Sequence, residues 1–347
     1  MTTSAKSGIW AMGLGLVVLG CGGGDDTAQM TSGPGITVSG TTTGINPGDD
    51  GDEKLDLGGA DDTDGMDGAG DAGNDDGCKK VDLLFVIDNS GSMEDEQANL
   101  IASVPGFIDA MVTELGDTEG YHVGVTTSDI YLGDIACAQE GALVTATTGM
   151  GSSNSPCAPY SSGMRFMTEA DDLTQKFGCA AQVGIAGDGN ERPMQTMLAA
   201  LSPGLTAPGA CNEGFLRDDA ILVVVIITDE EDDHELVGCM GVTNVDPQPG
   251  SNGEPAQWYD QLIAAKGGNE KSIVMLALVG PDSGQMCPAL DKCTGGITGA
   301  EVATRIIELT NMFTYGFVGP VCEPYGPFFQ SAISQIKSAC DDFVTQG

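Results

Sequence analysis

The chain has 347 residues, of which 51 are Asp or Glu and 13 are Lys or Arg, so its formal net charge is −38. This excess of negative charge argues against nucleic acid as a partner, because phosphate contacts need clusters of Lys and Arg. About 270 residues follow the first 77, which is enough for one large α/β domain or two small ones.

An apolar run near the start of the chain, residues 9–19, is too short to span a bilayer but has the length of a signal-peptide core. It ends in Val18-Leu19-Gly20-Cys21, which resembles the lipobox of bacterial lipoproteins. The resemblance implies cleavage before Cys21 and lipid on its thiol. Residues 1–21 are therefore predicted to be a lipoprotein signal peptide, with membrane anchoring through Cys21. The alternative is an ordinary signal peptide, with Cys21 a chance residue or part of a disulfide set.

Residues 22–77 are rich in Gly, Asp and Thr and contain few large apolar side chains. Such a segment cannot bury enough surface to offset its ordering entropy, so we expect a disordered, self-repelling linker. Its aspartates faintly resemble calcium-binding repeats but lack the offsets of an EF-hand loop. Gly22, instead of an aspartate after the lipidated cysteine, favours the outer membrane or cell surface of a Gram-negative bacterium.

From residue 78 to residue 347, continuous apolar runs alternate with segments of helical spacing. The alternation predicts an α/β fold with a mostly parallel sheet and helices on both faces. The segment 128–178 is predicted to form an edge hairpin and a disulfide-bearing loop. Strands are predicted at 81–88, 121–129, 220–233, 271–280 and 312–318, and helices at 93–115, 192–201, 255–266, 299–311 and 327–343.

The first and third predicted strands end on acidic residues, Asp88 and Asp229. In a parallel sheet the carboxyl ends of the strands form the ligand-binding edge, so we expect these two carboxylates to lie close together. Ser90 and Ser92 follow at alternate positions, where strand turns into helix, and their hydroxyls would converge on the same place. An all-oxygen set suits Mg²⁺ or Mn²⁺ better than zinc or copper, with Ca²⁺ as the alternative.

The sequence DNSGS after LLFVI, with VVVIITDEEDD far downstream, resembles the metal-ion-dependent adhesion site of von Willebrand factor A (vWA) domains. The resemblance extends over roughly Cys78 to Phe343. It implies a Rossmann-like, doubly wound sheet and a binding function, in which a ligand's carboxylate completes the coordination of a metal ion. It also implies that the metal ligands, direct or through water, are Asp88, Ser90, Ser92 and Asp229.

The chain departs from that family in the middle loop, IAGDGNERPMQTMLAAL, where the family has a threonine ligand. Thr196 lies a turn inside the predicted helix, whereas Glu191 precedes Pro193, a favourable first helical residue. We predict Glu191 as the ligand, the alternative being a surface helix-capping acid. Asp95 and Glu96 resemble a second metal site of integrin β-type domains. Acids in a first helical turn also complement the helix dipole, and we prefer that interpretation.

Two function classes fit this pattern: a binding module that holds a protein or glycan partner through a metal ion, and a hydrolase that uses the metal or Ser90. The chain has no G-x-S-x-G motif and only two histidines, which favours binding over enzymatic activity. A docking or regulatory subunit of an envelope complex is a further alternative. The acids that follow Asp229, up to His234, are predicted to form a solvated loop, the alternative being a calcium site.

Ten cysteines remain after Cys21, and an even number in an exported chain suggests disulfides. No Cys-x-x-Cys pair occurs, and His122 and His234 cannot complete a zinc site. The candidates for disulfide formation are Cys78, Cys137, Cys157, Cys179, Cys211, Cys239, Cys287, Cys293, Cys322 and Cys340.

Two pairings are predicted among these cysteines. Cys287 with Cys293 would close a short loop. Cys78 with either Cys322 or Cys340 would join the two ends of the domain. The remaining pairings are left open, because ten cysteines allow about 945 combinations.

Overall fold

The computed structural model describes residues 78–114, 120–232, 250–282, 287–290 and 298–343. The chain divides into two units, residues 1–68 and 69–347, and every described residue belongs to the second. The predicted signal peptide with Cys21 and the predicted linker lie outside the described residues, as do Cys239, Cys293 and His234. Within the described ranges, no helix is both long and apolar enough to cross a membrane.

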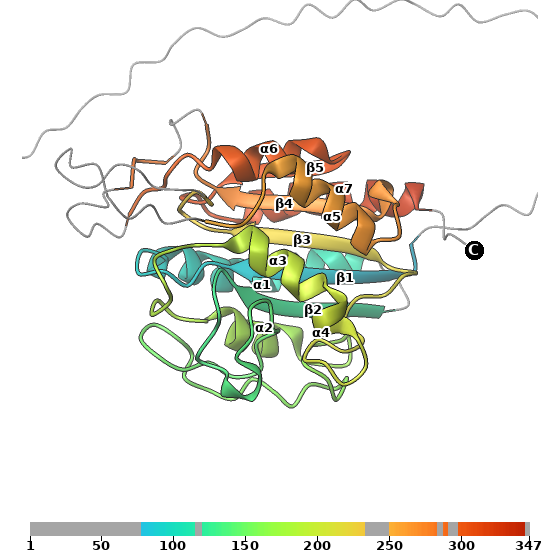
Figure 1. Ribbon diagram of the computed structural model, residues 1–347, viewed down its shortest axis with the longest axis horizontal. Helices are drawn as coiled ribbons and strands as arrows, with labels where there is room; N and C mark the ends of the chain where they lie inside the picture. The colour runs from blue at the N-terminus through green and yellow to red at the C-terminus, as the bar shows by residue number, and fades with distance from the viewer. Residues whose placement is uncertain (1–77, 115–119, 233–249, 283–286, 291–297, 344–347) are drawn as a thin grey trace, which may run out of the picture. The chain divides into compact units, whose positions relative to one another are not determined.

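Five strands form a parallel sheet: β1 (Lys80–Ile87), β2 (Gly120–Thr127), β3 (Ile221–Ile227), β4 (Ile273–Val279) and β5 (Tyr315–Pro320). Their order is β2-β1-β3-β4-β5, and each neighbouring pair is parallel (Figure 1). Every side chain of β3 and β4 is buried, as expected for continuous apolar runs covered on both faces. The predicted α/β fold with a parallel sheet is thus confirmed over the described residues.

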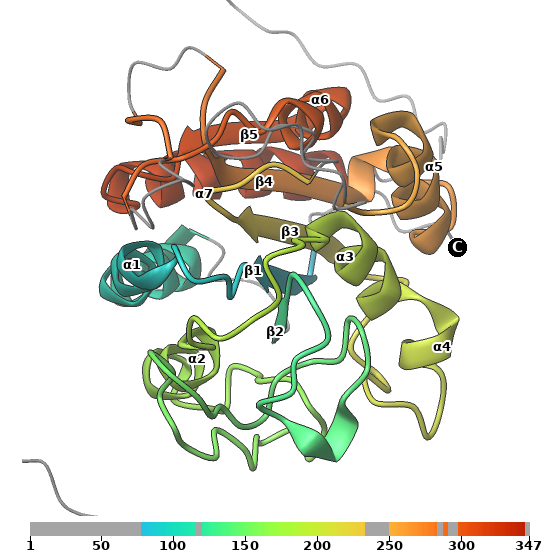
Figure 2. The ribbon, with the colours of Figure 1, turned by 60° about the vertical axis from the view of Figure 1, so that its left-hand side comes forward.

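Helices cover both faces of this sheet (Figure 2). Successive side chains of a strand point to opposite faces, so Leu83 and Phe85 belong to one apolar core, and Leu84 and Val86 to the other. The first core is closed by α1 (Glu94–Glu114), α2 (Leu173–Ala181) and α7 (Gly326–Asp342), and the second by α3 (Pro193–Leu201), α5 (Pro255–Ala265) and α6 (Thr304–Met312). The connections contain α4 (Pro203–Thr206), η1 (Ile135–Cys137) and η3 (Glu270–Ser272).

The three strands at the β2-β1-β3 side of the sheet end level with one another. Ile87 of β1 pairs with Thr127 of β2 and with Ile227 of β3. The loops that follow these strands therefore start side by side at the carboxyl edge. The chain passes from β1 to β2 on one side of β1 and then crosses from β2 to β3 on the other side. This edge therefore contains the topological switch point at which such folds bind ligands.

The predicted edge hairpin in residues 128–178 is wrong. This segment consists of loops, η1 and the first part of α2 and contains no named strand. One isolated antiparallel bridge, Ala146 with Pro156, lies within it, and another, Val123 with Met167, joins it to β2. Pro156 and Pro159 offer no amide hydrogen to a neighbouring strand, which disfavours a regular hairpin here. The loops leave the outer side of β2 covered by irregular structure rather than by a sixth strand.

Four disulfides join the described cysteines, as is typical of an exported protein. The predicted bond between Cys78 and Cys340 is confirmed and joins the start of β1 to the end of α7. The predicted bond between Cys287 and Cys293 is wrong, because Cys287 bonds to Cys322. The neighbouring parallel strands β4 and β5 end side by side, which brings the segments that follow them together. The other two bonds are Cys137–Cys211 and Cys157–Cys179.

Candidate metal centre

Asp88 is the first residue after β1, and three loops hold its carboxylate. The Oδ1 atom accepts hydrogen bonds from the amide of Ser90 (2.8 Å) and from the hydroxyl of Ser128 (3.3 Å). The Oδ2 atom accepts one from the hydroxyl of Thr228 (2.7 Å). Ser128 and Thr228 directly follow β2 and β3, so the level strand ends fix the position of this carboxylate. Asp88 is buried, with 1% of its surface exposed.

The two serines of the Asp-x-Ser-x-Ser pattern lie beside Asp229, as the sequence predicts. The Ser92 hydroxyl donates to Oδ1 of Asp229 over 3.1 Å, and the Ser90 and Ser92 hydroxyl oxygens are 3.2 Å apart. Asp229 itself is fully buried. The structure therefore brings two hydroxyls and the carboxylates that follow β1 and β3 to one place.

Glu191 ends the loop before α3 and contributes a third buried carboxylate. Only 4% of its surface is exposed. Its Oε1 atom has no hydrogen-bond partner, and the same is true of Oδ2 of Asp229. A buried carboxylate oxygen without a partner is costly, because water no longer solvates it and no protein donor replaces the water. These two oxygens are therefore the free acceptors of the site.

The carboxylates of the site destabilise one another's charged forms. Burial, and then the charge of Asp88, raise the pKa of Glu191 to about 11 and that of Asp229 to about 8. Glu230 raises both pKa values further, and burial raises the pKa of Asp88 as well. Without a cation, Glu191 and Asp229 retain protons at neutral pH. A divalent cation would replace the protons and satisfy the free oxygens.

The composition of the site limits the cation it fits. Within the described ranges, no three Asp, Glu, His or Cys side chains are gathered closely enough to hold a metal ion by themselves. A cation would therefore also need the hydroxyls of Ser90 and Ser92, together with water. Hydroxyl, carboxylate and water ligands are the set that Mg²⁺ and Mn²⁺ prefer, and Ca²⁺ also accepts it.

The structure also decides between two roles for the middle loop. The hydroxyl of Thr196 is buried inside α3, where it donates to the carbonyl oxygen of Pro193 (3.1 Å). Glu191 is not a surface helix cap, because it is buried and the cap residue of α3 is Arg192, which makes no side-chain capping bond. Of the two residues, Glu191 is thus the one with a buried, unpartnered side-chain oxygen, and the charge of Asp88 acts on it.

Comparisons with known proteins do not identify a function for this site. No protein-family model and no curated protein matches the chain. The pilus adhesin SpaC from Lactobacillus rhamnosus GG, in an open conformation, resembles it with a TM-score of 0.39 and 15% identity, over 75% of this chain and 30% of the adhesin. Proximal thread matrix protein 1 from the mussel byssus resembles it with a TM-score of 0.37 and 13% identity, over 76% of this chain and 47% of the matrix protein. The chain spans less than half of either protein, and TM-scores this low do not establish a shared function.

The acids after Asp229 do not form the solvated loop that the sequence predicts, at least as far as the structure describes them. Glu231 and Asp232 are buried. Oδ2 of Asp232 accepts the amide of Met194 (3.0 Å) in the first turn of α3, and Oε2 of Glu231 accepts the amide of Arg305 (2.7 Å) in the first turn of α6. The loop after β3 therefore positions two helices, since carboxylates stabilise free amides at helix N-termini.

The acids at the start of α1 separate into an exposed and a buried group. Asp95 is exposed, as expected for an acid that complements the helix dipole, but Glu96 is 1% exposed and its Oε2 has no hydrogen-bond partner. Burial raises the pKa of Glu96 to about 9, with contributions from Asp95 and Asp229. The hydroxyl of Tyr325 is also buried without a partner, and the charges of Glu96 and Asp229 act on it. The dipole alone does not account for Glu96.

His122 lies at the opposite end of the sheet from the serines. It is near the start of β2, paired in register with Asp82 near the start of β1, and its Nδ1 lies 2.8 Å from the carbonyl oxygen of Phe215. Burial lowers its pKa to about 4. His122 therefore cannot act as a base for Ser90 within this fold, because Ser90 follows the carboxyl end of β1.

Proposed function

We propose that the chain is an exported binding module of the vWA type that holds Mg²⁺ or Mn²⁺, with Ca²⁺ as the alternative. The ligands, direct or through water, would be Asp88, Ser90, Ser92, Glu191 and Asp229. The observation that carries this proposal is the pair of buried, unpartnered oxygens, Oε1 of Glu191 and Oδ2 of Asp229, beside two serine hydroxyls.

The arrangement of the strands supports a vWA-like site. The Asp-x-Ser-x-Ser pattern begins directly after β1, and Asp229 comes directly after Thr228 at the end of β3. These two neighbouring strands form the switch point of the β2-β1-β3-β4-β5 sheet, where open α/β folds bind their ligands.

A cation held at this edge would supply an electron-poor coordination position for an oxygen of a protein or glycan partner. The residues of the chain would fix that position: Ser128 and Thr228 orient Asp88, and Ser92 orients Asp229. Glu191 adds a full negative charge where vWA domains have a neutral hydroxyl. It would tighten the hold on the cation and weaken its attraction for an acidic partner, so the site would depend less on a partner's carboxylate.

Two further features belong to the proposal. Lipid attached to Cys21 would anchor the protein in a membrane, in keeping with the outer membrane or cell surface of a Gram-negative bacterium. Asp95 and Glu96 would hold a second cation, which is supported by the unpartnered Oε2 of Glu96 and the unpartnered hydroxyl of Tyr325.

Calorimetric titration with MgCl₂ and MnCl₂, after removal of bound ions with EDTA, tests the cation site. We expect the wild type to bind a divalent cation, and Asp88→Ala and Asp229→Ala to lose that binding. Asp260→Asn, which removes an exposed acid of α5, should bind as the wild type does. A folded wild-type protein that binds no divalent cation at millimolar concentrations would refute the proposal.

A further inference from the structure

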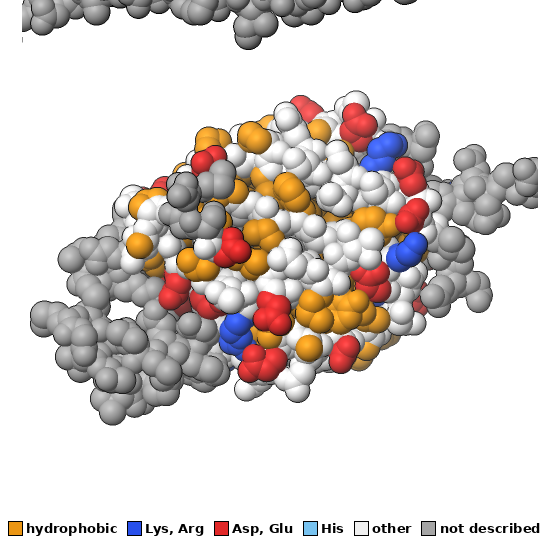
Figure 3. All heavy atoms as spheres, turned by 90° about the horizontal axis from the view of Figure 1, so that it is seen from above, with side chains coloured by type: hydrophobic (Ala, Val, Ile, Leu, Met, Phe, Trp, Pro, Cys, Tyr) orange, Lys and Arg blue, Asp and Glu red, His pale blue; other side chains and the backbone are white. Residues whose placement is uncertain are grey.

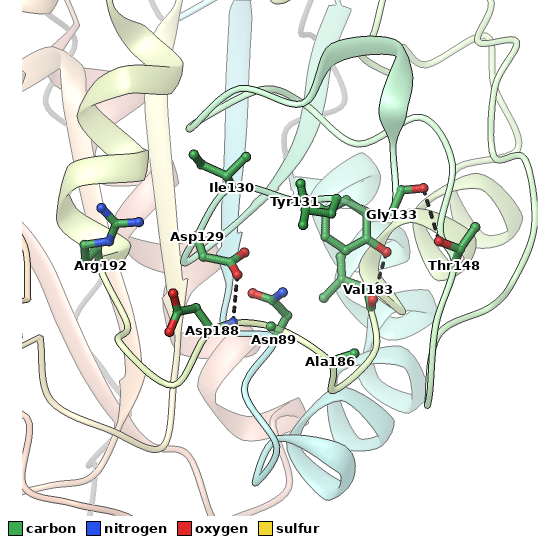
Figure 4. Close-up of a pocket in the computed structure, with 12 residues that line it drawn as sticks. Asn89, Asp129, Ile130, Tyr131, Gly133, Thr148, Val183, Ala186, Asp188 and Arg192 are labelled. Carbon is green, nitrogen blue, oxygen red and sulfur yellow. Dashed lines mark hydrogen bonds between the residues drawn. The ribbon is translucent and has the colours of Figure 1, made fainter. Parts of the chain in front are cut away.

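A hollow of about 510 Å³ opens at the carboxyl edge, next to the candidate metal centre (Figure 4). Its volume falls within the range of ordinary ligand sites, about 300–1,000 Å³. The ring of Tyr131 forms one wall and is held there by a hydrogen bond from its hydroxyl to the carbonyl oxygen of Val183 (2.8 Å). Ala186 extends the same wall. The hollow thus has a fixed aromatic and aliphatic lining.

The hollow adjoins the metal centre without sharing its ligands. Asn89 lines it, and the Ser128 hydroxyl lies 3.3 Å from both Oδ1 of Asn89 and Oδ1 of Asp88. The carbonyl oxygen of Asn89 accepts the amide of Gly187 (2.8 Å), which joins the floor of the hollow to the loop before α3. None of the five proposed metal ligands lines the hollow. Binding there is therefore separable from binding of the cation.

Exposed apolar side chains are concentrated in the segment of the chain that contributes much of the lining of this hollow. Eight large apolar side chains of the described residues are exposed, and five of them belong to residues 130–164. Ile130 and Leu132 line the hollow, and Leu132 is 74% exposed. Met150 is 68% exposed and lies beside it, since its carbonyl oxygen accepts the amide of Ile185. Clustered exposed apolar side chains are typical of a surface that contacts another protein.

Two disulfides fix the segment that carries these side chains. Cys137 is bonded to Cys211, and Cys157 is bonded to Cys179. The segment is therefore fastened to α2 and to the loop after α4. A surface held in place before binding loses less conformational entropy when a partner docks, which favours affinity.

The charge at the rim of the hollow is negative. Asp129 and Asp188 lie together, with Oδ2 of Asp129 accepting the amide of Asp188 (2.8 Å). The positive charge among the lining residues is that of Arg192, and Glu140 pairs with it at 3.3 Å. Acidic side chains also outnumber basic ones on the face shown in Figure 3, which looks down on the α6 and β5 side of the domain and not on the hollow. A partner that enters the hollow would gain from a basic group.

We propose that the hollow binds a segment of a partner protein that carries a Lys or Arg between apolar side chains. The exposed Ile130 and Leu132 favour apolar groups over the hydroxyl-rich surface of a glycan. The linker of residues 22–77 is an unsuitable occupant, because it is rich in Asp and would be repelled by Asp129 and Asp188. A second copy of this acidic chain meets the same repulsion. The proposal does not require the cation of the neighbouring site.

The test uses two capped pentapeptides, Ala-Leu-Lys-Leu-Ala and Ala-Leu-Glu-Leu-Ala, titrated in EDTA into the isotopically labelled chain without its predicted signal peptide. Chemical shifts measure the affinity and place the peptide. At low salt we expect the Lys peptide to bind at least about tenfold more tightly than the Glu peptide and to change the chemical shifts of Tyr131 and Ala186. Asp188→Asn should reduce the preference about threefold or more. Leu132→Ser should weaken both peptides about fivefold or more.

Two control variants remove exposed side chains far from the hollow in sequence: Val112→Ser an apolar one in α1, and Asp260→Asn an acidic one in α5. Neither should change the affinity for either peptide. Equal binding of the two peptides, or no effect of Leu132→Ser, would overturn the proposal. So would a self-associating wild type that Leu132→Ser renders monomeric in sedimentation, because a second copy would then occupy the hollow. Peptide binding that requires Mg²⁺ would overturn it too, while leaving the cation site intact. If only the cation titrations fail, the proposal for the hollow still stands.

Discussion

Replacement of Glu191 by Thr restores the neutral hydroxyl of the vWA pattern, and replacement by Gln removes only the charge. If Glu191 binds the cation, both changes should raise the dissociation constant for Mg²⁺. The direction follows from the structure, because Glu191 is 4% exposed and an oxygen of its carboxylate has no other partner. Affinity in oxygen sites rises with the charge of the ligands.

The expected loss of cation affinity is the attraction between Glu191 and the cation minus the free energy needed to remove the proton from Glu191. Two unit charges about 4 Å apart interact by about 4 kcal/mol at an effective dielectric constant of about 20, so a divalent cation gains about 8 kcal/mol from Glu191. Burial, and then the charge of Asp88, raise the pKa of Glu191 to about 11. At pH 7 the cation must therefore displace a proton at a cost of about 5 kcal/mol. The remaining 3 kcal/mol or so corresponds to a dissociation constant raised about a hundredfold at most.

The assay is calorimetric titration of MgCl₂ into wild type, Glu191→Thr and Glu191→Gln at pH 6, 7 and 8. The ratio of the variant's dissociation constant to that of the wild type should grow with pH, because the wild type's proton cost falls by about 1.4 kcal/mol per pH unit. Thermal unfolding in EDTA checks that each variant folds. A folded Glu191→Gln variant with unchanged affinity at all three pH values would show that another group completes the site.

Three further predictions concern stability and anchoring. In EDTA, folding raises the pKa of Asp229 from 3.8 to about 8 and that of Glu191 from 4.5 to about 11, so their protonation stabilises the fold at low pH and this contribution is lost as the pH rises. The urea midpoint should therefore fall from pH 5 to pH 8, and Mg²⁺ should reverse the fall. A midpoint that is independent of pH would contradict this prediction. Joint replacement of Cys78 and Cys340 by Ser opens a loop of 262 residues and should lower the free energy of unfolding by about 2–5 kcal/mol in urea titrations, and an unchanged value would count against this tie. Cys21→Ser should release the protein from membrane fractions or leave it unprocessed, and wild-type fractionation would contradict the lipid anchor.

The strands were predictable because their signal is local. β3 is apolar throughout, and β1 is apolar except for Lys80 and the buried Asp82. Both runs stop at the carboxyl edge, where Asp88 and Thr228 mark the end. α3 and α5 likewise begin at prolines that suit a first helical position. α2 was missed, although Asp172 caps it through the amide of Gln175 (3.0 Å), because nine residues containing Gly178 show little helical preference.

The parts of the site that depend on tertiary contacts could not be predicted. A run of acids is usually solvated, and the burial of Asp232 depends on the amide of Met194, which lies 38 residues away in sequence. The role of Ser128 follows from the register of β2 with β1, which a single sequence does not specify. Polar residues at the very end of an apolar strand, such as Ser128 and Thr228, were the available signal for the groups that orient Asp88.

The bond between Cys78 and Cys340 has a mechanical consequence. It lies at the start of β1, and the candidate metal centre lies at the other end of the same strand. A pull between whatever precedes Cys78 and a partner held at the carboxyl edge would run along the axis of β1. Because β1 is hydrogen-bonded to β2 on one side and to β3 on the other, this tension would shear both ladders at once instead of unzipping them one bond at a time. Tension applied before Cys78 and at the proposed binding edge would therefore pass along a strand that has hydrogen-bonded neighbours on both sides.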